Sequence, residues 1–377
     1  MEKNTNGNKK ISLFYHFFDD GGIERVLLNL TKDFIKNGYQ VDLVLLEKTG
    51  AFISVLSKEV RVVELKKTNQ KYFTRLSVLA SLIRYLKTEQ PILFLSSGVL
   101  CNVLSGVARL FLKKNTIPIV GIQHEHLSTV LSYKSTVRRI STLIKIFIGY
   151  RLLSHIVAVS NGVARDLESR LFLKNDIVKT IYNPIDIEEI QTKAQQSLPT
   201  EYQFFENIPY TVMVGRLHEQ KNYPLALEAF KKVSTQRPEL HLVILGQGSE
   251  EEVIKKQIEY LGLQEKVHLL GFQNNPFVFI KYAELFMLSS SWEGFGNVLV
   301  ESMALGVPVV STDCPSGPAE ILDYGKYGVL VPVNDSDTLA EVIIQTHTSP
   351  IDGKILEERA GEFSADAISE LYLQLIE

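Results

Sequence analysis

Short apolar runs rich in β-branched residues alternate with segments of helical periodicity along most of the chain. The first runs are ISLFYHF and YQVDLVLL, and ILFLSS, IPIVGIQ, HIVAVS and IVKTIY follow. Strands that alternate with helices predict parallel sheets with crossover helices. In the segment between the first two runs, apolar residues recur at helical spacing and Gly38 follows as a stop signal: Ile23, Val26, Leu27, Leu30 and Phe34. We expect this face of the helix to pack on a sheet.

The alternation is interrupted by a polar stretch that carries proline near both ends, at about 184–208. A second series of runs then begins with YTVMVG and continues through LHLVILG, KVHLLG, AELFMLSS and PVVSTD, with helices expected at 223–236, 250–261 and 297–305. We therefore predict two doubly wound α/β domains, at 1–190 and 209–360, joined by a linker at 191–208. Such sheets bind ligands beyond the carboxyl ends of their strands, so both domains should present strand-end loops to a shared cleft.

The composition agrees with two cores, because 377 residues of which 45% are apolar exceed one ordinary domain. Cys101 and Cys314 match no C-x-x-C spacing, so we expect neither a disulfide framework nor a zinc site, and a reducing cytoplasm fits. The N-terminus lacks the form of a signal peptide, and no apolar stretch approaches the roughly 20 residues that cross a bilayer. We expect a cytoplasmic protein that is soluble or peripheral on the inner face of the membrane.

The net charge of −3 hides an uneven distribution. Residues 1–190 hold 27 Lys and Arg against 17 Asp and Glu, a balance of +10, whereas residues 191–377 hold 13 against 26, a balance of −13. Such asymmetry favours an anionic surface or partner for the first half. Within it, STVRRISTLIKIFIGYRLL combines cations with a broad apolar face and could lie on an anionic membrane leaflet. The alternative is an ordinary helix packed on the sheet with a solvated basic edge.

Two glutamates stand eight residues apart in SWEGFGNVLVESMALGVPVVSTD. Gly294 and Gly296 favour a loop that ends at a helix start near Asn297, a good cap, which leaves Glu293 in the loop and Glu301 one turn inside the helix. A helix start suits a phosphate or sugar hydroxyls. Glu301 could then accept hydrogen bonds from a vicinal diol such as a ribose, and Glu293 could hold sugar hydroxyls. The alternative is a solvated loop residue and a polar-face residue.

Cations and glycines follow other predicted strands. Arg216 and Lys221, in VGRLHEQKN, surround the first strand-to-helix turn of the second domain. An Arg fork and a Lys point charge beside a helix start are what a diphosphate requires, although surface cations can also be merely solvated. Gly21 and Gly22 link the first strand to the first helix, where they let backbone approach a phosphate or sugar closely.

Three further patterns have competing interpretations. GIQHEH places His124 and His126 at a strand end, but no third and fourth ligand complete a metal site, so we prefer a sugar-contacting His124. Residues 246–248 begin a dinucleotide-binding fingerprint, yet Glu251 stands where its third glycine should be, which favours simple turn glycines. Residues 335–337 have the D-x-D form of some metal-dependent sugar transferases, but a helix cap is the stronger interpretation.

Taken together, these residues resemble the retaining glycosyltransferases of family 4, which have the two-domain GT-B fold. The motifs follow in order over nearly the whole chain: GGIERVLLNL, VSNGVARDL, NPID, VGRLHEQKN, LGQGSEEE, the E-x7-E element from Glu293 to Glu301, and GVPVVSTDCPSGPAEIL.

The resemblance implies roles for the matching positions of the second domain. Arg216 and Lys221 would bind the donor diphosphate, and Glu301 would bind the nucleotide ribose. Glu293 would contact the donor sugar as a catalytic residue. The loop of Gly294, Phe295, Gly296 and Asn297 would contact sugar or phosphate.

For the first domain, the resemblance implies that Gly21 and Gly22 close over the diphosphate and that His124 faces the transferred sugar as the second catalytic residue. His126 takes that place if the alignment shifts slightly. The segment 361–377 resembles the terminal helix that returns to the first domain. The family also implies retention of configuration without a protein nucleophile, and no need for a metal or other cofactor.

The function implied is transfer of a hexose or N-acetylhexosamine from a nucleotide sugar, a UDP-sugar, to a glycan or lipid-linked acceptor in polysaccharide or glycoconjugate synthesis. We expect no nucleic-acid partner. An oxidoreductase would require a complete G-x-G-x-x-G, and none is found at the strand ends. The remaining alternatives are a GT-B epimerase or phosphorylase, or a nucleotide-sugar-binding protein that has lost catalysis.

Overall fold

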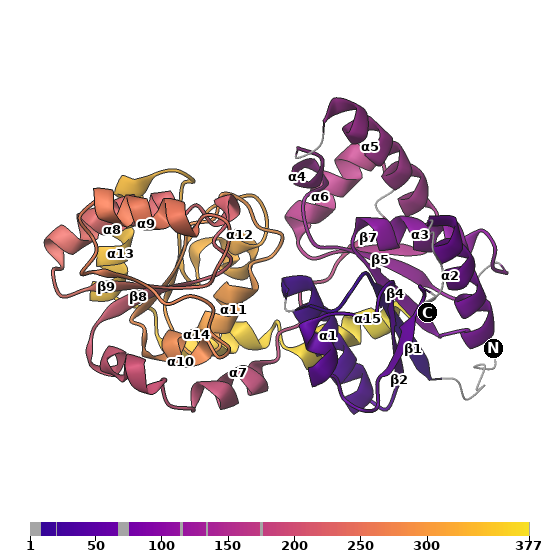
Figure 1. Ribbon diagram of the computed structural model, residues 1–377, viewed down its shortest axis with the longest axis horizontal. Coiled ribbons are helices and arrows are strands. Elements are labelled where there is room, and N and C mark those ends of the chain that lie inside the picture. The colour runs from indigo at the N-terminus through magenta and orange to yellow at the C-terminus, as the bar shows by residue number, and fades with distance from the viewer. Residues whose placement is uncertain are drawn as a thin grey trace. The chain divides into compact units, whose positions relative to one another are not determined.

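The computed structural model describes residues 9–19, 21–66, 75–113, 116–132, 135–173 and 176–376. The chain divides into two compact units. The first unit comprises residues 1–184 and 365–377, and the second unit comprises residues 185–364 (Figure 1).

The first unit is built on a parallel sheet of seven strands in the order β3-β2-β1-β4-β5-β6-β7. The strands are β1 (Lys10–Tyr15), β2 (Gln40–Leu45), β3 (Arg61–Glu64), β4 (Leu93–Ser97), β5 (Ile119–Gln123), β6 (His155–Ala158) and β7 (Val178–Thr180). The order reverses between β1 and β4, so the chain leaves these two neighbours in opposite directions. All residues of β4 and β5 are buried, as expected for strands covered by helices on both faces.

Helices cover both faces of this sheet (Figure 1). They are α1 (Gly22–Lys36), α2 (Arg75–Glu89), α3 (Val99–Arg109), α4 (Leu127–Ser132), α5 (Thr136–Arg151), α6 (Asn161–Leu171) and α15 (Ala365–Leu373), with short 3₁₀ turns η1 (Ala51–Val55) and η5 (Gln374–Ile376). Right-handed crossovers place α1 on one face and α2 and α3 on the other. The predicted apolar stripe of α1 is buried, except that Ile23 is only partly so.

The C-terminal helix α15 packs against α1, as predicted for 361–377, although α15 itself begins at Ala365. Lys36 Nζ lies 3.0 Å from Asp366 Oδ2, and the Ser369 hydroxyl donates to the Asp33 carboxylate. The last segment of the chain is therefore part of the first unit.

The second unit contains a parallel sheet of six strands in the order β10-β9-β8-β11-β12-β13. The strands are β8 (Tyr210–Val214), β9 (His241–Leu245), β10 (Val267–Leu269), β11 (Leu285–Leu288), β12 (Val309–Thr312) and β13 (Val329–Val331). The order reverses between β8 and β11. Helices α8 (Tyr223–Gln236), α9 (Glu251–Tyr260) and α13 (Ser336–Thr348) lie on one face, and α10 (Phe277–Tyr282), α11 (Asn297–Met303) and α14 (Gly353–Gly361) lie on the other (Figure 1). Short elements complete this unit: α7 (Ile187–Ala194), η2 (Thr200–Asn207), η3 (Glu219–Lys221), α12 (Pro318–Ile321) and η4 (Asp323–Gly325).

The boundary between the units differs from the predicted one. It follows Pro184, and the expected linker at 191–208 lies inside the second unit, where it forms the end of α7 and the turn η2. Helix α7 packs on α10, Asn275 Nδ2 donates to Lys193 O at 2.9 Å, and Phe205 is buried. The stretch is polar because it covers the surface of this unit, and its few apolar residues are enough to anchor it.

The chain enters and leaves the second unit at adjacent points. Ile185 and Ser364 form a parallel β-bridge, and Ile185 N donates to Phe363 O at 2.9 Å.

No helix in the described part of the chain is long and apolar enough to cross a membrane.

Candidate functional site

The loops that follow β8 and β11 meet at the carboxyl edge of the second unit's sheet. These two strands are hydrogen-bonded neighbours, with Leu285 opposite Thr211 and Phe286 opposite Val212. They also flank the point where the strand order reverses, which in doubly wound sheets is the usual ligand-binding position. The first loop carries the predicted cations at 216 and 221, and the second carries Glu293.

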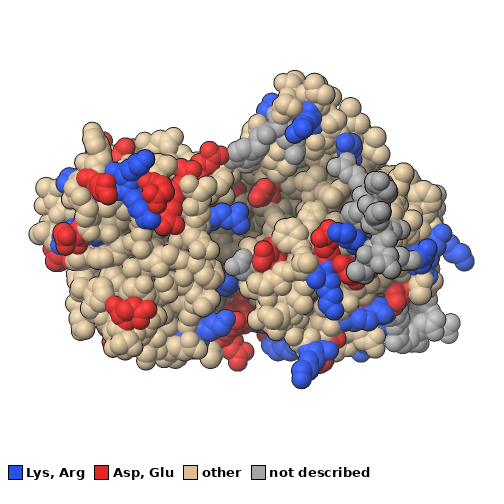
Figure 2. All heavy atoms as spheres, viewed as in Figure 1, with Lys and Arg blue, Asp and Glu red and all other residues tan. Residues whose placement is uncertain are grey.

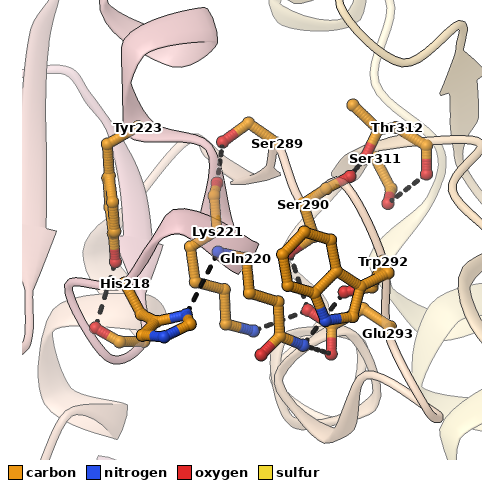
Figure 3. Close-up of polar contacts among 11 residues, drawn as sticks. His218, Gln220, Lys221, Tyr223, Ser289, Ser290, Trp292, Glu293, Ser311 and Thr312 are labelled. Carbon is orange, nitrogen blue, oxygen red and sulfur yellow. Dashed lines mark hydrogen bonds and ion pairs between the residues drawn. The ribbon is translucent and has the colours of Figure 1, made fainter. Parts of the chain in front are cut away.

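An ion pair between Lys221 and Glu293 lies at the centre of this edge (Figure 3). Lys221 Nζ is 2.7 Å from Glu293 Oε1, and the two side chains are 15% and 8% exposed. The Ser290 hydroxyl donates to the same carboxylate oxygen at 2.6 Å, and Gln220 Nε2 approaches Oε2 at 3.4 Å. An ammonium group has three donors, so the pair leaves Lys221 with two further protons to offer.

Gln220 and two serines join the loops around this ion pair. Gln220 Nε2 donates to Trp292 O at 2.9 Å, and Ser291 N donates back to Gln220 O at 2.8 Å. The Ser289 hydroxyl donates to Lys221 O at 2.6 Å (Figure 3). Contacts between the two loops thus hold the Lys221 ammonium group and the Glu293 carboxylate in place. Because these groups are already ordered, less conformational entropy is lost when a ligand binds them.

Glycines let a third loop pack directly on the loop after β8. Gly246 has φ +144°, and a Cβ there would lie 1.9 Å from Gly215 O. A Cβ at Gly248 would lie 2.3 Å from Leu217 O, while Leu217 N donates to the carbonyl of Gln247 at 3.0 Å. The structure therefore confirms the turn interpretation of residues 246–248, because these glycines serve contact between backbones.

Helix α11 begins at Asn297, as predicted, but its N-cap lies one residue earlier than predicted. Gly296, at φ +105°, occupies the N-cap position and Asn297 is the first helical residue, so the assignment of Asn297 as the cap is wrong. Only glycine adopts this left-handed conformation at little cost. The helix ends at Met303, two residues before the predicted end. Glu301, on this helix, and Glu293 are 6% and 7% exposed. The alternative of a solvated loop residue at 293 and a polar-face residue at 301 is therefore wrong.

The neighbouring loop 313–317 supports Phe295. Gly317 has φ +75°, and a Cβ there would lie 1.8 Å from Phe295 O. The Phe295 ring is buried and contacts the ring of Phe363 with centroids 5.5 Å apart. Only the backbone around Phe295 is therefore positioned to contact a ligand, whereas its ring belongs to the core.

Arg216 differs from Lys221 in its surroundings. Its side chain is exposed, and it makes no hydrogen bond or ion pair with any residue that the structure describes. The guanidinium group keeps all five N–H donors, which can engage phosphate oxygens in a fork.

Two acidic groups beside the ion pair stay protonated. Burial and the Glu293 carboxylate raise the pKa of the Cys314 thiol to about 12. The same two causes raise the pKa of Tyr223, whose hydroxyl donates to Gly215 O at 3.0 Å. At neutral pH neither group supplies an anion, so Cys314 is no candidate nucleophile.

In the first unit, the two predicted glycines differ. Gly21 is the N-cap of α1, and a Cβ there would lie 2.4 Å from Glu24 Oε2. A Cβ at Gly22 would meet no atom within 4 Å. A Cβ at position 21 would therefore displace only the end of the Glu24 side chain, and steric conflict within this unit requires glycine at neither position. The ligand contacts predicted for both stay predictions.

His124 is held by a neighbour that the sequence analysis missed. The Ser97 hydroxyl lies 2.6 Å from His124 Nε2, across the adjacent strands β4 and β5. Burial lowers the pKa of His124 to about 3, so the ring is neutral and only Nδ1 stays available to a ligand. His126 instead points Nδ1 toward Asp166 Oδ1 at 3.9 Å. Ser97, like Gln220 and Ser290, is a polar residue at a strand end or turn, and nothing in one sequence distinguishes it from other such serines.

The D-x-D pattern has the predicted capping role. Asp335 Oδ1 accepts a hydrogen bond from Thr338 N at 3.0 Å at the start of α13. Among the described residues, no group of three or more His, Cys, Asp and Glu side chains is arranged to hold a metal ion.

Comparisons with known proteins assign both halves of the chain. Residues 195–364 match the family described as "Glycosyl transferases group 1", and residues 20–189 match "Glycosyltransferase Family 4". The chain is 29% identical over 338 residues to the N-acetylgalactosamine-N,N'-diacetylbacillosaminyl-diphospho-undecaprenol 4-alpha-N-acetylgalactosaminyltransferase of Campylobacter jejuni, covering 88% of each protein. It is 34% identical over 195 residues to an uncharacterized glycosyltransferase of Methanocaldococcus jannaschii, covering 48% of each. The chain thus aligns with only about half the length of the latter relative.

Solved structures share the fold over nearly the full length of the chain. The crystal structure of Anabaena HepE in complex with UDP matches with a TM-score of 0.79 at 21% identity and covers 97% of this chain and 98% of that one. The crystal structure of TarM matches with a TM-score of 0.76 at 16% identity, over 98% of both chains. These similarities confirm the predicted pair of parallel α/β sheets as the GT-B fold.

Proposed function

Because the chain belongs to the glycosyltransferases whose group 1 and family 4 domains it carries, we propose that it transfers a hexose or N-acetylhexosamine from a UDP-sugar to a glycan or lipid-linked acceptor. The Anabaena HepE structures contain UDP, UDP with glucose, and UDP-glucose, which supports a uridine nucleotide. The name of the Campylobacter jejuni relative contains a diphospho-undecaprenol, which supports a lipid-linked acceptor.

The observation that carries this proposal is the largely buried Lys221–Glu293 ion pair on the edge that also bears Arg216, which has no partner among the described residues. A sugar nucleotide reacts by losing its diphosphate, on which negative charge develops. Lys221 would donate its two remaining protons to phosphate oxygens, and Arg216 would engage others in a fork. Cations placed before the reaction stabilise a leaving group without reorganising at the moment of transfer.

We assign two tasks to Glu293. It positions Lys221 through the 2.7 Å contact, and its remaining lone pairs accept hydrogen bonds from hydroxyls of the donor sugar. Glu301 would bind the ribose diol, with the Phe295–Asn297 backbone beside it. The roles predicted for Gly21, Gly22 and His124 belong to the same proposal.

Retention and metal independence are parts of this proposal. The cations at 216 and 221 do the charge-neutralising work that a metal does in other transferases. The acceptor would attack from the face that the diphosphate leaves, with a phosphate oxygen assisting removal of its proton. Cys314 is protonated and Glu293 is engaged by an ammonium group, so we assign neither as a nucleophile.

Calorimetric titration with UDP, GDP and ADP tests the donor site. We expect UDP to bind, and Lys221→Met to weaken binding by at least tenfold while the matched surface variant Lys256→Met leaves it unchanged. UDP binding that is equal in all three proteins would contradict the site. Transfer of labelled sugar to lipid-linked acceptors, with and without EDTA, then tests the reaction, and NMR of the product's anomeric proton tests retention. Interconversion of UDP-sugars without an acceptor would indicate an epimerase, and binding without turnover would indicate a protein that has lost catalysis.

A further inference from the structure

Helix α5 of the first unit has two apolar faces, and only one of them is covered. Its inner face packs on α3, where Gly106 and Gly149 let the two backbones approach so closely that a Cβ at Gly106 would lie 1.9 Å from Gly149 O. The outer face bears five apolar side chains that are 38% to 79% exposed: Val137, Ile140, Ile144, Phe147 and Ile148. We call these five residues the α5 outer face.

The α5 outer face forms one stripe. At 100° per residue its five members span an arc of about 100°, and the buried Ile146 and Tyr150 lie roughly 150° and 110° from the centre of that arc. A surface helix normally presents polar residues to water, and a helix that is apolar all round is normally buried. The sequence analysis left two interpretations of this segment open, a helix that lies on an anionic leaflet and an ordinary helix with a solvated basic edge, and in the structure the edge that faces water is mainly apolar.

Neighbouring elements extend the apolar surface. Phe172, which follows α6, is 79% exposed, and Arg151 Nη2 holds its carbonyl at 3.0 Å. The end of α3 lies beside the end of α5, since Arg109 Nη1 donates to Leu152 O at 3.0 Å. Leu110 and Phe111, directly after α3, are 63% and 53% exposed. Exposed apolar residues of two further elements therefore lie near the C-terminal end of α5, and large exposed apolar patches mark interaction sites.

The charged residues of α5 itself are all cations. Arg138, Arg139, Lys145 and Arg151 are exposed on α5, and Arg151 lies over the Phe147 ring at 4.1 Å. In the sequence, Glu125 is the only acid between Gln90 and Arg165. Figure 2 shows Lys and Arg among uncharged residues over α5, with no Asp or Glu on the visible surface there.

We propose that the α5 outer face docks on an anionic lipid bilayer. Apolar side chains flanked by cations match the boundary between acyl chains and negatively charged headgroups. A second copy of the chain fits this surface less well, because a twofold interface would bring the same cations from both copies together in an apolar contact. The helix would lie in the plane of the membrane, with Phe147 and Phe172 at headgroup depth. This inference rests on the surface alone and does not depend on the transfer reaction.

Flotation with lipid vesicles tests the proposal without donor or acceptor. We expect the protein to float with vesicles of equal parts phosphatidylcholine and phosphatidylglycerol, and much less with phosphatidylcholine alone. Ile140→Ser combined with Ile144→Ser should lower the partition coefficient by about tenfold or more, because each loses the burial of an apolar side chain. Arg138→Gln combined with Lys145→Gln should lower it by about tenfold at low salt and little at high salt.

Two matched controls carry equivalent changes in the second unit. Val253→Ser with Ile355→Ser replaces apolar residues of similar exposure, and Lys231→Gln with Lys256→Gln removes two exposed cations. Both controls should float like the original protein. All four variants alter exposed side chains, so circular dichroism and thermal melting should be unchanged.

Three results would overturn the proposal: no flotation with anionic vesicles, flotation that the α5 variants leave unchanged, or equal flotation with phosphatidylcholine alone. A concentration-dependent dimer that the Ile140 and Ile144 changes dissociate, without any vesicle binding, would instead assign the surface to a second copy.

Discussion

Lys221→Met tests how much the second unit depends on the ion pair at its binding edge. The substitution keeps an unbranched side chain of similar length but leaves the Glu293 carboxylate, 8% exposed, without its cation. Breaking a buried pair by removing one partner typically costs 3–5 kcal/mol. Lys221 is 15% exposed, so water screens part of this interaction, and Ser290 still donates to the carboxylate. We therefore expect the free energy of unfolding of the second unit to fall by about 2–3 kcal/mol.

The assay must report on the second unit, because a chain of two units need not unfold in a single step. Native-state hydrogen exchange of peptides from β8, β11 and α11 measures local stability in this unit, and peptides from β4 and β5 serve as an internal reference. Glu293→Gln is the matched control, since it removes the charge but keeps a shape that Ser290 and Gln220 can still contact. We expect the double variant Lys221→Met/Glu293→Gln to be more stable than Lys221→Met alone.

Unchanged exchange in Lys221→Met would refute this reasoning, and so would effects of the two changes that simply add. Either result would mean that the contact between Lys221 and Glu293 contributes nothing to the stability of the second unit. The proposed donor site would then rest on Arg216 and the helix start alone.

Three other changes have distinct expected outcomes. Gly246→Ala would place a Cβ 1.9 Å from Gly215 O in a backbone with φ +144°. We therefore expect the free energy of unfolding to fall by at least about 3 kcal/mol, measured by thermal melting, and UDP binding to weaken, measured by calorimetry. Asp335→Ala removes the N-cap of α13 and should lower the free energy of unfolding by about 1 kcal/mol while UDP binding stays unchanged. A loss of UDP affinity would instead favour a ligand role for the D-x-D pattern. Because the pKa of Cys314 rises from an ordinary value near 9 to about 12, the unfolded chain binds fewer protons than the folded one between these values, and stability should fall as pH rises through that window. In the folded protein at pH 8 this thiol should resist iodoacetamide, and rapid alkylation of native protein, followed by mass spectrometry, would contradict its burial.

The parts of the fold that depend on periodicity could be predicted from the sequence. Alternating strands and helices indicated two parallel sheets, and the predicted helix at 223–236 agrees with α8. The same pattern placed the loops at 215–221 and 289–296 at the carboxyl ends of strands, where doubly wound sheets bind ligands. The sequence thus indicated the edge that carries both residues, whereas the pairing of β8 with β11 and the contact between Lys221 and Glu293 are findings of the structure.

Features that depend on tertiary contact were not predictable in this way. The polar stretch at 191–208 has the composition of a linker, but packing of α7 on α10 makes it part of the second unit. Asn297 is the better cap by side-chain preference, yet the close turn beside it requires the φ of +105° that Gly296 supplies. Ser290, Gln220 and Ser97 orient the predicted residues, and no local pattern marks such contacts between distant segments.

The bridge between Ile185 and Ser364 has a consequence for how this chain can be rearranged. Residues 185 and 364, at which the second unit begins and ends, are therefore neighbours. The second unit has the topology of a domain, or cassette, inserted between residues 184 and 365 of the first unit. Exchange of that cassette for one with a different nucleotide preference would require only two splice points, side by side. Donor specificity could thus be changed by exchange of whole second units, in the laboratory or in evolution, without redesign of the seven-stranded sheet of the first unit.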